Sequence, residues 1–205
     1  MKEITLYGAG GHCYAAIELI RSLNEYKPSA ILDDAPNGDS IMNLEVNLYT
    51  GQEFQNLCIT IGDNAVRRKI AKRFSVQYPT FIHSSAVVYP SSSIGKGTLI
   101  HPNAVIDADV KIGDFCIINN NASLSHNVTV SDFAHIAIQA AVAGGVKIGE
   151  GTLIGAGSII LPEITIGKWA TIGAGAVVTK NVPDYAMVYG NPAKIINYNN
   201  ELHEI

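Results

Sequence analysis

An aliphatic side chain recurs at every sixth position along residues 82–183, so this stretch divides into 17 hexads with nothing left over. The second position of the hexad is often glycine, where we expect backbone dihedrals that other residues avoid. A six-residue period is typical of a β-helix, in which each short strand points one aliphatic side chain inward before a turn. Three strands close one coil of about 18 residues, which predicts about five and a half coils. The hexads begin with Ile82, Val88, Ile94, Ile100, Ile106, Ile112, Ile118, Leu124, Val130, Ile136, Val142, Ile148, Ile154, Ile160, Ile166, Ile172 and Val178.

Residues 1–80 lack this period and alternate short apolar runs with segments of helical spacing. A strand-helix-strand pattern of this kind predicts a small parallel sheet. We therefore expect an α/β domain over residues 1–80, a β-helix over 81–183 and a C-terminal segment over 184–205, of which residues 196–205 form a polar tail. The expected strands are 4–7, 29–32 and 57–61, the expected helices are 14–24 and 65–74, and a polar loop surrounds residues 36–39.

The turn after the first expected strand contains Gly10 and Gly11, followed by His12. Glycines let a ligand approach the backbone, and the N–H groups that open the next helix favour a phosphate. The third glycine of a dinucleotide-binding turn is missing, so a plain strand-to-helix turn is the alternative. Asp33 and Asp34 end the second strand, where they either accept hydrogen bonds from a nucleoside or face solvent.

Composition narrows the classes of function. The formal net charge is −4, with only 14 lysines and arginines, so nucleic acid is not an expected partner. No apolar run is long enough to span a bilayer, and no secretory segment opens the chain. Cys13, Cys58 and Cys116 show no paired spacing, which indicates a reduced, cytoplasmic protein.

Several short motifs accompany the repeat: Gly8-Ala9-Gly10-Gly11-His12, Ile31-Leu32-Asp33-Asp34, Ile61-Gly62-Asp63-Asn64 with Arg67, and Tyr189-Gly190-Asn191-Pro192-Ala193-Lys194. With the hexads, they resemble the bacterial sugar acetyltransferases of the PglD and NeuD type, within the hexapeptide acyltransferase superfamily. The resemblance implies a left-handed parallel β-helix and a homotrimer with active sites between subunits. It also implies that acetyl-coenzyme A is the co-substrate and that the N-terminal domain binds a nucleotide-linked amino sugar.

The resemblance also implies residue roles. His126 matches the general base of the family, and an imidazole, with its ordinary pKa of about 6.5, suits proton removal from an amine near neutrality. A solvated corner position is the alternative for each histidine, and a structural role is the alternative for each corner glycine. The implied substrate-binding residues are Gly10, Gly11 and His12 at the diphosphate, Asp33 and Asp34 at the nucleoside, and Gly62. The implied coenzyme-binding residues are His135 near the thioester, Asn119, Gly144, Gly155, Gly173 and Lys194.

Two positions depart from the family pattern. Tyr14 stands where a lysine is common, which leaves one sugar or phosphate contact undefined. Asn127 stands where Asp or Glu usually follows the base. Asparagine can orient an imidazole by hydrogen bonding, but it cannot offset the charge that the ring gains. Either another carboxylate does so, or the substrate amine arrives already neutral.

Three other functions remain as alternatives. A sialic acid O-acetyltransferase would use the same coenzyme and base with a hydroxyl acceptor. A γ-type carbonic anhydrase would need three zinc-binding histidines, but His101, His126 and His135 are 25 and 9 residues apart, which argues against a metal site. A non-catalytic nucleotide-sugar-binding protein is the third, favoured by Tyr14 and Asn127. The preferred hypothesis is a sugar N-acetyltransferase with His126 and Asn127 as catalytic residues.

Overall fold

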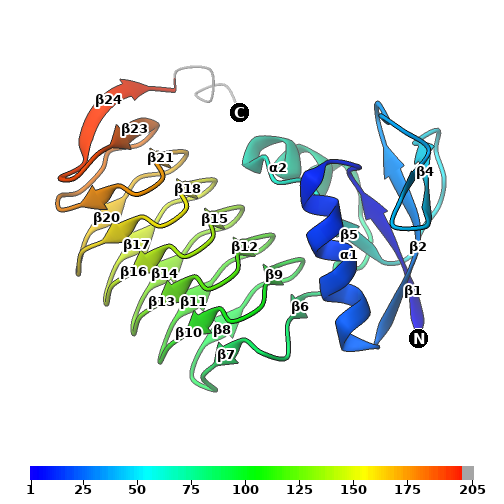
Figure 1. The fold of residues 1–205 in the computed structure, drawn as a ribbon, viewed down its shortest axis with the longest axis horizontal. Helices are drawn as coiled ribbons and strands as arrows, with labels where there is room; N and C mark the ends of the chain where they lie inside the picture. The colour runs from blue at the N-terminus through cyan, green and yellow to red at the C-terminus, as the bar shows by residue number, and fades with distance from the viewer. Residues whose placement is uncertain (200–205) are drawn as a thin grey trace.

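The computed structural model describes residues 1–199, in which an N-terminal α/β unit (residues 1–80) packs beside a β-helix (Figure 1). Its first sheet has the strand order β3-β4-β2-β1-β5. Strands β1, β2, β4 and β5 pair in parallel, so the expected parallel sheet is confirmed. The elements of this unit are β1 (Lys2–Tyr7), α1 (Gly11–Leu23), β2 (Tyr26–Asp33), β3 (Ser40–Ile41), β4 (Leu44–Leu48), β5 (Leu57–Ile59) and α2 (Asn64–Arg73).

Within the N-terminal unit, the sequence pattern did not predict the hairpin β3-β4. Met42 and Asn43 join its antiparallel strands, and both have positive φ angles of 50° and 64°. Two such residues form the tight turn that suits the twist of a hairpin. The usual signal for this turn is a glycine, which is missing here, so the polar stretch around residues 36–39 suggested only a loop.

The β-helix confirms the hexad pattern, because every hexad from residue 82 to residue 178 starts at the second residue of a short strand. Strands 18 residues apart pair in parallel, as Ile82 does with Ile100. The aliphatic first positions form one continuous core. The strands are β6 (Phe81–Ile82), β7 (Val87–Val88), β8 (Ser93–Ile94), β9 (Leu99–Ile100), β10 (Val105–Ile106), β11 (Lys111–Ile112), β12 (Ile117–Ile118), β13 (Ser123–Leu124), β14 (Thr129–Val130), β15 (His135–Ile136), β16 (Ala141–Val142), β17 (Lys147–Ile148), β18 (Leu153–Ile154), β19 (Ile159–Ile160), β20 (Thr165–Ile166), β21 (Thr171–Ile172) and β22 (Val177–Val178).

These strands form three sheets, which we call faces. The first face contains β6, β9, β12, β15, β18 and β21, the second contains β7, β10, β13, β16, β19 and β22, and the third contains β8, β11, β14, β17 and β20. Helices α1 and α2 lie beside the first face (Figure 1). The N-terminal unit therefore covers one side of the β-helix.

The glycines at the second hexad position have a different cause from the one expected. Gly113 and Gly149 do not have positive φ angles. A Cβ at either position would instead overlap backbone atoms of the next coil, those of Asp132 and Lys168 respectively. The left-handed dihedrals occur at the fourth hexad position, as at Asn103 and Asp109. Glycine at the second position thus permits close stacking of coils.

The C-terminal segment adds two strands to the first face. β23 (Ala186–Tyr189) pairs with β21, and β24 (Lys194–Tyr198) pairs antiparallel with β23. The expected polar tail is therefore wrong for residues 196–198, because backbone pairing with β23 orders them despite their exposed side chains. Residues 200–205 of that tail lie outside the described residues.

One buried arginine joins the two units. Arg67 on α2 is 1% exposed, and its guanidinium donates to the carbonyl oxygens of Phe115 and Phe133 in two successive coils, at 2.8 and 2.7 Å. It also donates to the carbonyl oxygens of Ile61 and Gly62. Burial lowers the pKa of Arg67 to about 10, so the side chain remains charged at neutral pH. These bonds fix α2 against the β-helix.

Candidate active site

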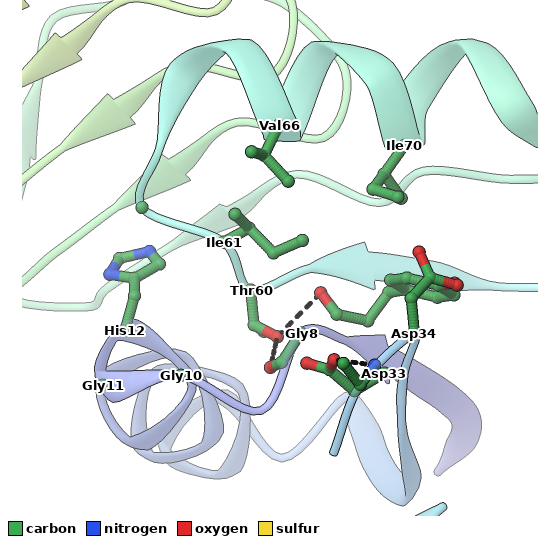
Figure 2. A pocket seen from close by; sticks show the side chains of 13 residues that line it. Gly8, Gly10, Gly11, His12, Asp33, Asp34, Thr60, Ile61, Val66 and Ile70 are labelled. Carbon is green, nitrogen blue, oxygen red and sulfur yellow. Dashed lines mark hydrogen bonds between the residues drawn. The ribbon is translucent and has the colours of Figure 1, made fainter. Parts of the chain in front are cut away.

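A cavity of about 480 Å³ lies at the carboxyl ends of β1, β2 and β5, with α2 above it (Figure 2). The chain leaves β1 on one side toward β2 and returns on the other side as β5, and ligands bind at such a reversal of strand order. His12 and Asp34 lie at opposite ends of the cavity (Figure 2). Its lining residues are Tyr7, Gly8, Gly10, Gly11, His12, Asp33, Asp34, Ala35, Thr60, Ile61, Gly62, Val66 and Ile70.

Thr60 contacts the backbone at the start of the glycine turn. Its buried hydroxyl lies 2.6 Å from the carbonyl oxygen of Gly8 and 3.0 Å from that of Tyr7. Gly8 has a φ of 113°, and a Cβ there would overlap Ile61. Only glycine combines this dihedral with this space. The turn therefore presents backbone to the cavity.

The two aspartates are both engaged within the protein. Asp33 accepts hydrogen bonds from the backbone N–H groups of Ala9 and Ala35, at 2.7 and 2.8 Å. Asp34 accepts from the Tyr7 hydroxyl at 2.6 Å and from Arg73 at 2.8 Å. The hydrogen bond from Tyr7, followed by that from Arg73, holds the pKa of Asp34 below its usual range. Asp33 thus orders the glycine turn, and Asp34 closes the far end of the cavity.

Three histidines meet where α1 packs against the first face, and we call His12, His101 and His135 the histidine cluster. The ring centroid of His12 lies 5.4 Å from that of His101 and 6.3 Å from that of His135. Burial lowers the pKa of His12 to about 3 and those of His101 and His135 to about 4. Asn119 Nδ2 lies 3.4 Å from His135 Nε2. At neutral pH these rings are uncharged, so they can exchange hydrogen bonds but not hold a proton as cations.

His126 has a different setting, at the exposed corner between β13 and β14. Its Nδ1 lies 2.9 Å from Asn127 Oδ1, and Asn127 Nδ2 donates to Asp109 Oδ2 at 3.0 Å. A Cβ on Gly144, one coil further along, would overlap the imidazole ring. Gly144 therefore provides the space that the ring occupies.

The other expected coenzyme residues lie on different parts of the β-helix. Asn119, Gly155 and Gly173 form one column, at the corner between the first and second faces. A Cβ on Gly173 would overlap the ring of Tyr189, so this glycine also has a packing role. Lys194 begins β24. A single chain thus does not gather these residues around His126.

The described residues contain no group of three or more His, Cys, Asp or Glu side chains that could hold a metal ion. Within residues 1–199, no helix is long and apolar enough to cross a membrane.

Comparison with known proteins identifies the family. The PglD N-terminal domain matches residues 3–74, and the bacterial transferase hexapeptide repeat matches residues 91–126 and 145–180. A perosamine N-acetyltransferase variant from Caulobacter crescentus, solved with coenzyme A and GDP-perosamine, is 32% identical, with a TM-score of 0.91 over 96% of this chain and 98% of that one. This chain belongs to the PglD-type family of sugar N-acetyltransferases.

Two further relatives of this sugar N-acetyltransferase agree. The acetyltransferase domain of PglB from Neisseria gonorrhoeae, solved with acetyl coenzyme A, is 32% identical, with a TM-score of 0.88 over 95% of this chain and 99% of that one. The UDP-N-acetylbacillosamine N-acetyltransferase of Bacillus subtilis is 36% identical over 113 residues, which span 47% of this chain and only 50% of that protein. The family and the enzyme class expected from the sequence are thus confirmed.

Sequence reasoning missed several residues of this sugar N-acetyltransferase. Thr60 and Arg73 gave no signal, because their partners Gly8 and Asp34 are distant in sequence. Asp109 did carry a signal, since it precedes Asn127 by 18 residues, which is one coil. The repeat length therefore predicts which residues stack, provided that the search extends to the neighbouring coil.

Proposed function

We propose that this enzyme transfers the acetyl group of acetyl-coenzyme A to the amino group of a nucleotide-linked amino sugar, with His126 as the general base. The amine nitrogen attacks the thioester carbonyl, so that a C–N bond forms and the C–S bond breaks. His126 takes the amine proton on Nε2 and returns it to the departing thiolate of coenzyme A. The observation that carries this assignment is the exposed imidazole of His126, oriented through Nδ1 by Asn127.

The cavity of the N-terminal unit suits the nucleotide. No described side chain caps α1 at Gly10, so the first N–H groups of the helix are available to a diphosphate at Gly10, Gly11 and His12. The apolar side chains Val66 and Ile70 face the cavity from α2 (Figure 2) and suit a nucleoside. Asp33 and Asp34 would bind the nucleoside through oxygen lone pairs that their internal bonds leave over, and Gly62 would contact the sugar.

The separation of His126 from the histidine cluster supports a site shared between subunits. His126 and His135 are nine residues apart in a coil of 18 residues, so they lie on opposite sides of one β-helix. The histidine cluster lies where the N-terminal unit meets the first face, whereas His126 lies at the corner between the other two faces. A substrate held by the N-terminal unit reaches a His126 most directly on a neighbouring copy.

The second face supplies a surface for that neighbour. Its outward side chains include Val87, Val105 and Ile159, which are 48%, 39% and 44% exposed. The third face instead presents Lys111, Thr129 and Lys147 to solvent. An apolar face of this kind on a three-sided prism supports a homotrimer packed through its second faces. In that assembly, acetyl-coenzyme A would lie between subunits along His135, Asn119, Gly144, Gly155, Gly173 and Lys194.

The amine acceptor is favoured over the hydroxyl of a sialic acid, because the relatives described above are N-acetyltransferases. The non-catalytic alternative loses its main support, since Asn127 connects His126 to a carboxylate. The three cysteines are free and buried, which is consistent with the proposed cytoplasmic location.

The test is release of coenzyme A thiol from acetyl-coenzyme A with a panel of nucleotide 3-amino and 4-amino sugars, and with free sialic acid. We expect release with one amino sugar, and His126→Asn should lower kcat about 10²- to 10⁴-fold, the usual contribution of a general base. His83→Asn, another histidine of the β-helix, is the matched control and should keep wild-type kcat. Release with sialic acid alone, or wild-type kcat in His126→Asn, would contradict the proposal.

A further inference from the structure

We propose that Asp109 is a positioning residue that acts on His126 through the Asn127 amide, in place of the acidic neighbour that is missing from the sequence. This inference rests on the proposed function, because it concerns the base of that reaction. His126 Nδ1, Asn127 and Asp109 form one continuous chain of hydrogen bonds, with steps of 2.9 and 3.0 Å. The chain crosses from one coil to the preceding one, since Asp109 and Asn127 are 18 residues apart.

The carboxylate fixes the orientation of the amide. An ionised carboxylate only accepts hydrogen bonds, so Asn127 must turn its Nδ2 donor toward Asp109. Its Oδ1 acceptor then faces His126, so the ring must carry its proton on Nδ1. This tautomer leaves Nε2 as the acceptor nitrogen, as a general base requires. Without Asp109, the amide could rotate by 180° and donate to Nδ1, which would select the opposite tautomer.

Asp109 and Asn127 form what we call the relay to His126, and the β-helix holds both residues in matching backbone conformations. Asp109 and Asn127 occupy the same hexad position in successive coils, with φ angles of 55° and 59°. Asn127 N–H donates to the carbonyl oxygen of Ala108 at 2.9 Å, which ties the two corners together. Aspartate and asparagine tolerate this left-handed conformation better than most residues. The backbone thus sets the spacing that the two side chains bridge.

The relay also bears on the charge of the ring. His126 becomes positively charged when it takes the amine proton. Its Nδ1 then donates to Asn127, and the hydrogen bond between Asn127 and Asp109 strengthens that donation. Asparagine alone orients the ring, but the anionic Asp109 adds the compensating charge one residue further away. Asp109 is therefore the carboxylate that offsets the charge of His126, one of the two alternatives that the sequence left open.

Exchanging the carboxylate and the amide tests the relay. We expect Asp109→Asn to lower kcat about 10- to 100-fold, the value of a hydrogen bond to a charged group. In the Asn127→Asp background a carboxylate contacts His126 directly, so adding Asp109→Asn should not lower kcat further. Asp107→Asn in the same corner is the matched control and should keep wild-type kcat. An equal loss from Asp109→Asn in both backgrounds would overturn the proposal.

Imidazole ¹⁵N NMR gives a readout that does not depend on turnover. The signals of His126 are those missing from the spectrum of His126→Asn. They should show a proton on Nδ1 in the wild type and a mixture of the two tautomers in Asp109→Asn. A wild-type ring protonated on Nε2 would overturn the relay without any variant of Asp109. Failure of the proposed function has a different signature: His126→Asn would keep wild-type kcat, although His126 of the wild-type protein carries its proton on Nδ1.

Discussion

Histidine occurs in two opposite settings, at the exposed corner that carries His126 and in the histidine cluster between α1 and the first face. His126 is exposed and has a hydrogen-bonded partner that leads to Asp109. The Nε2 atoms of His12 and His101 are buried, with no hydrogen-bond partner among the described residues. Burial penalises the charged ring, so the cluster stays neutral, whereas an exposed ring with a polar relay can hold a proton during a reaction. Solvent access and hydrogen-bond partners therefore distinguish the proposed base from the three buried histidines.

The packing around the histidine cluster depends on the docking of α2 against the β-helix. Loss of Arg67 should therefore disturb this packing and leave the corner that carries His126 intact. Arg67→Met would leave the carbonyl oxygens of Phe115 and Phe133 without their donor. We expect a loss of about 3 kcal/mol in the free energy of unfolding of the N-terminal unit, the cost of unsatisfied buried acceptors. Trp169 of the β-helix is the only tryptophan, and it packs against Arg68 of α2. Its fluorescence therefore reports the docking of α2 against the β-helix.

The matched control for Arg67→Met is Lys69→Met, which changes an exposed cation on the same helix. It should leave urea unfolding and Trp169 emission close to wild type. Equal midpoints for the two variants would mean that Arg67 does not anchor the N-terminal unit.

The position of the His126 ring depends instead on the space above Gly144, and Gly144→Ala should displace the ring. An added Cβ would overlap the imidazole and displace the ring from its bond with Asn127. We expect kcat to fall about 100-fold, since misplacement of a catalytic group by about 1 Å has that effect. Binding of the nucleotide sugar in the N-terminal cavity should not change. Gly157→Ala is the steric control, because no atom lies near its Cβ position, although its positive φ adds some strain. A Gly144→Ala enzyme with full activity would show that the ring has room to move.

How far the sequence predicts this arrangement follows from periodicity. The hexads specify which residues face the core and which share a corner, so the column that contains Asp109, Asn127 and Gly145 can be written down from the sequence alone. The N-terminal sheet was predicted from its apolar strands and the glycine turn, because these signals are local. Docking of α2 was not predicted, because the partners of Arg67 are backbone carbonyls 48 and 66 residues away. A backbone acceptor exists at every residue and leaves no trace in the sequence.

The histidine cluster predicts a loss of stability in acid. The folded pKa values of His12, His101 and His135 lie at about 3, 4 and 4, below the value of about 6.5 expected for an unfolded chain. Between about pH 6.5 and pH 4 the unfolded chain binds more protons, so stability is full above this window and falls as the pH drops through it.

Each buried histidine should contribute about 1.4 kcal/mol of this loss per pH unit within that window. His101→Leu removes one of them, together with a buried nitrogen that has no partner among residues 1–199. Its free energy of unfolding, measured in urea at pH 7 and pH 5.5, should therefore change by about 1.4 kcal/mol less than that of the wild type. If the free energy of unfolding of His101→Leu changed between pH 7 and pH 5.5 as much as that of the wild type, His101 would be protonated in the folded protein. Burial would then not keep the histidine cluster neutral.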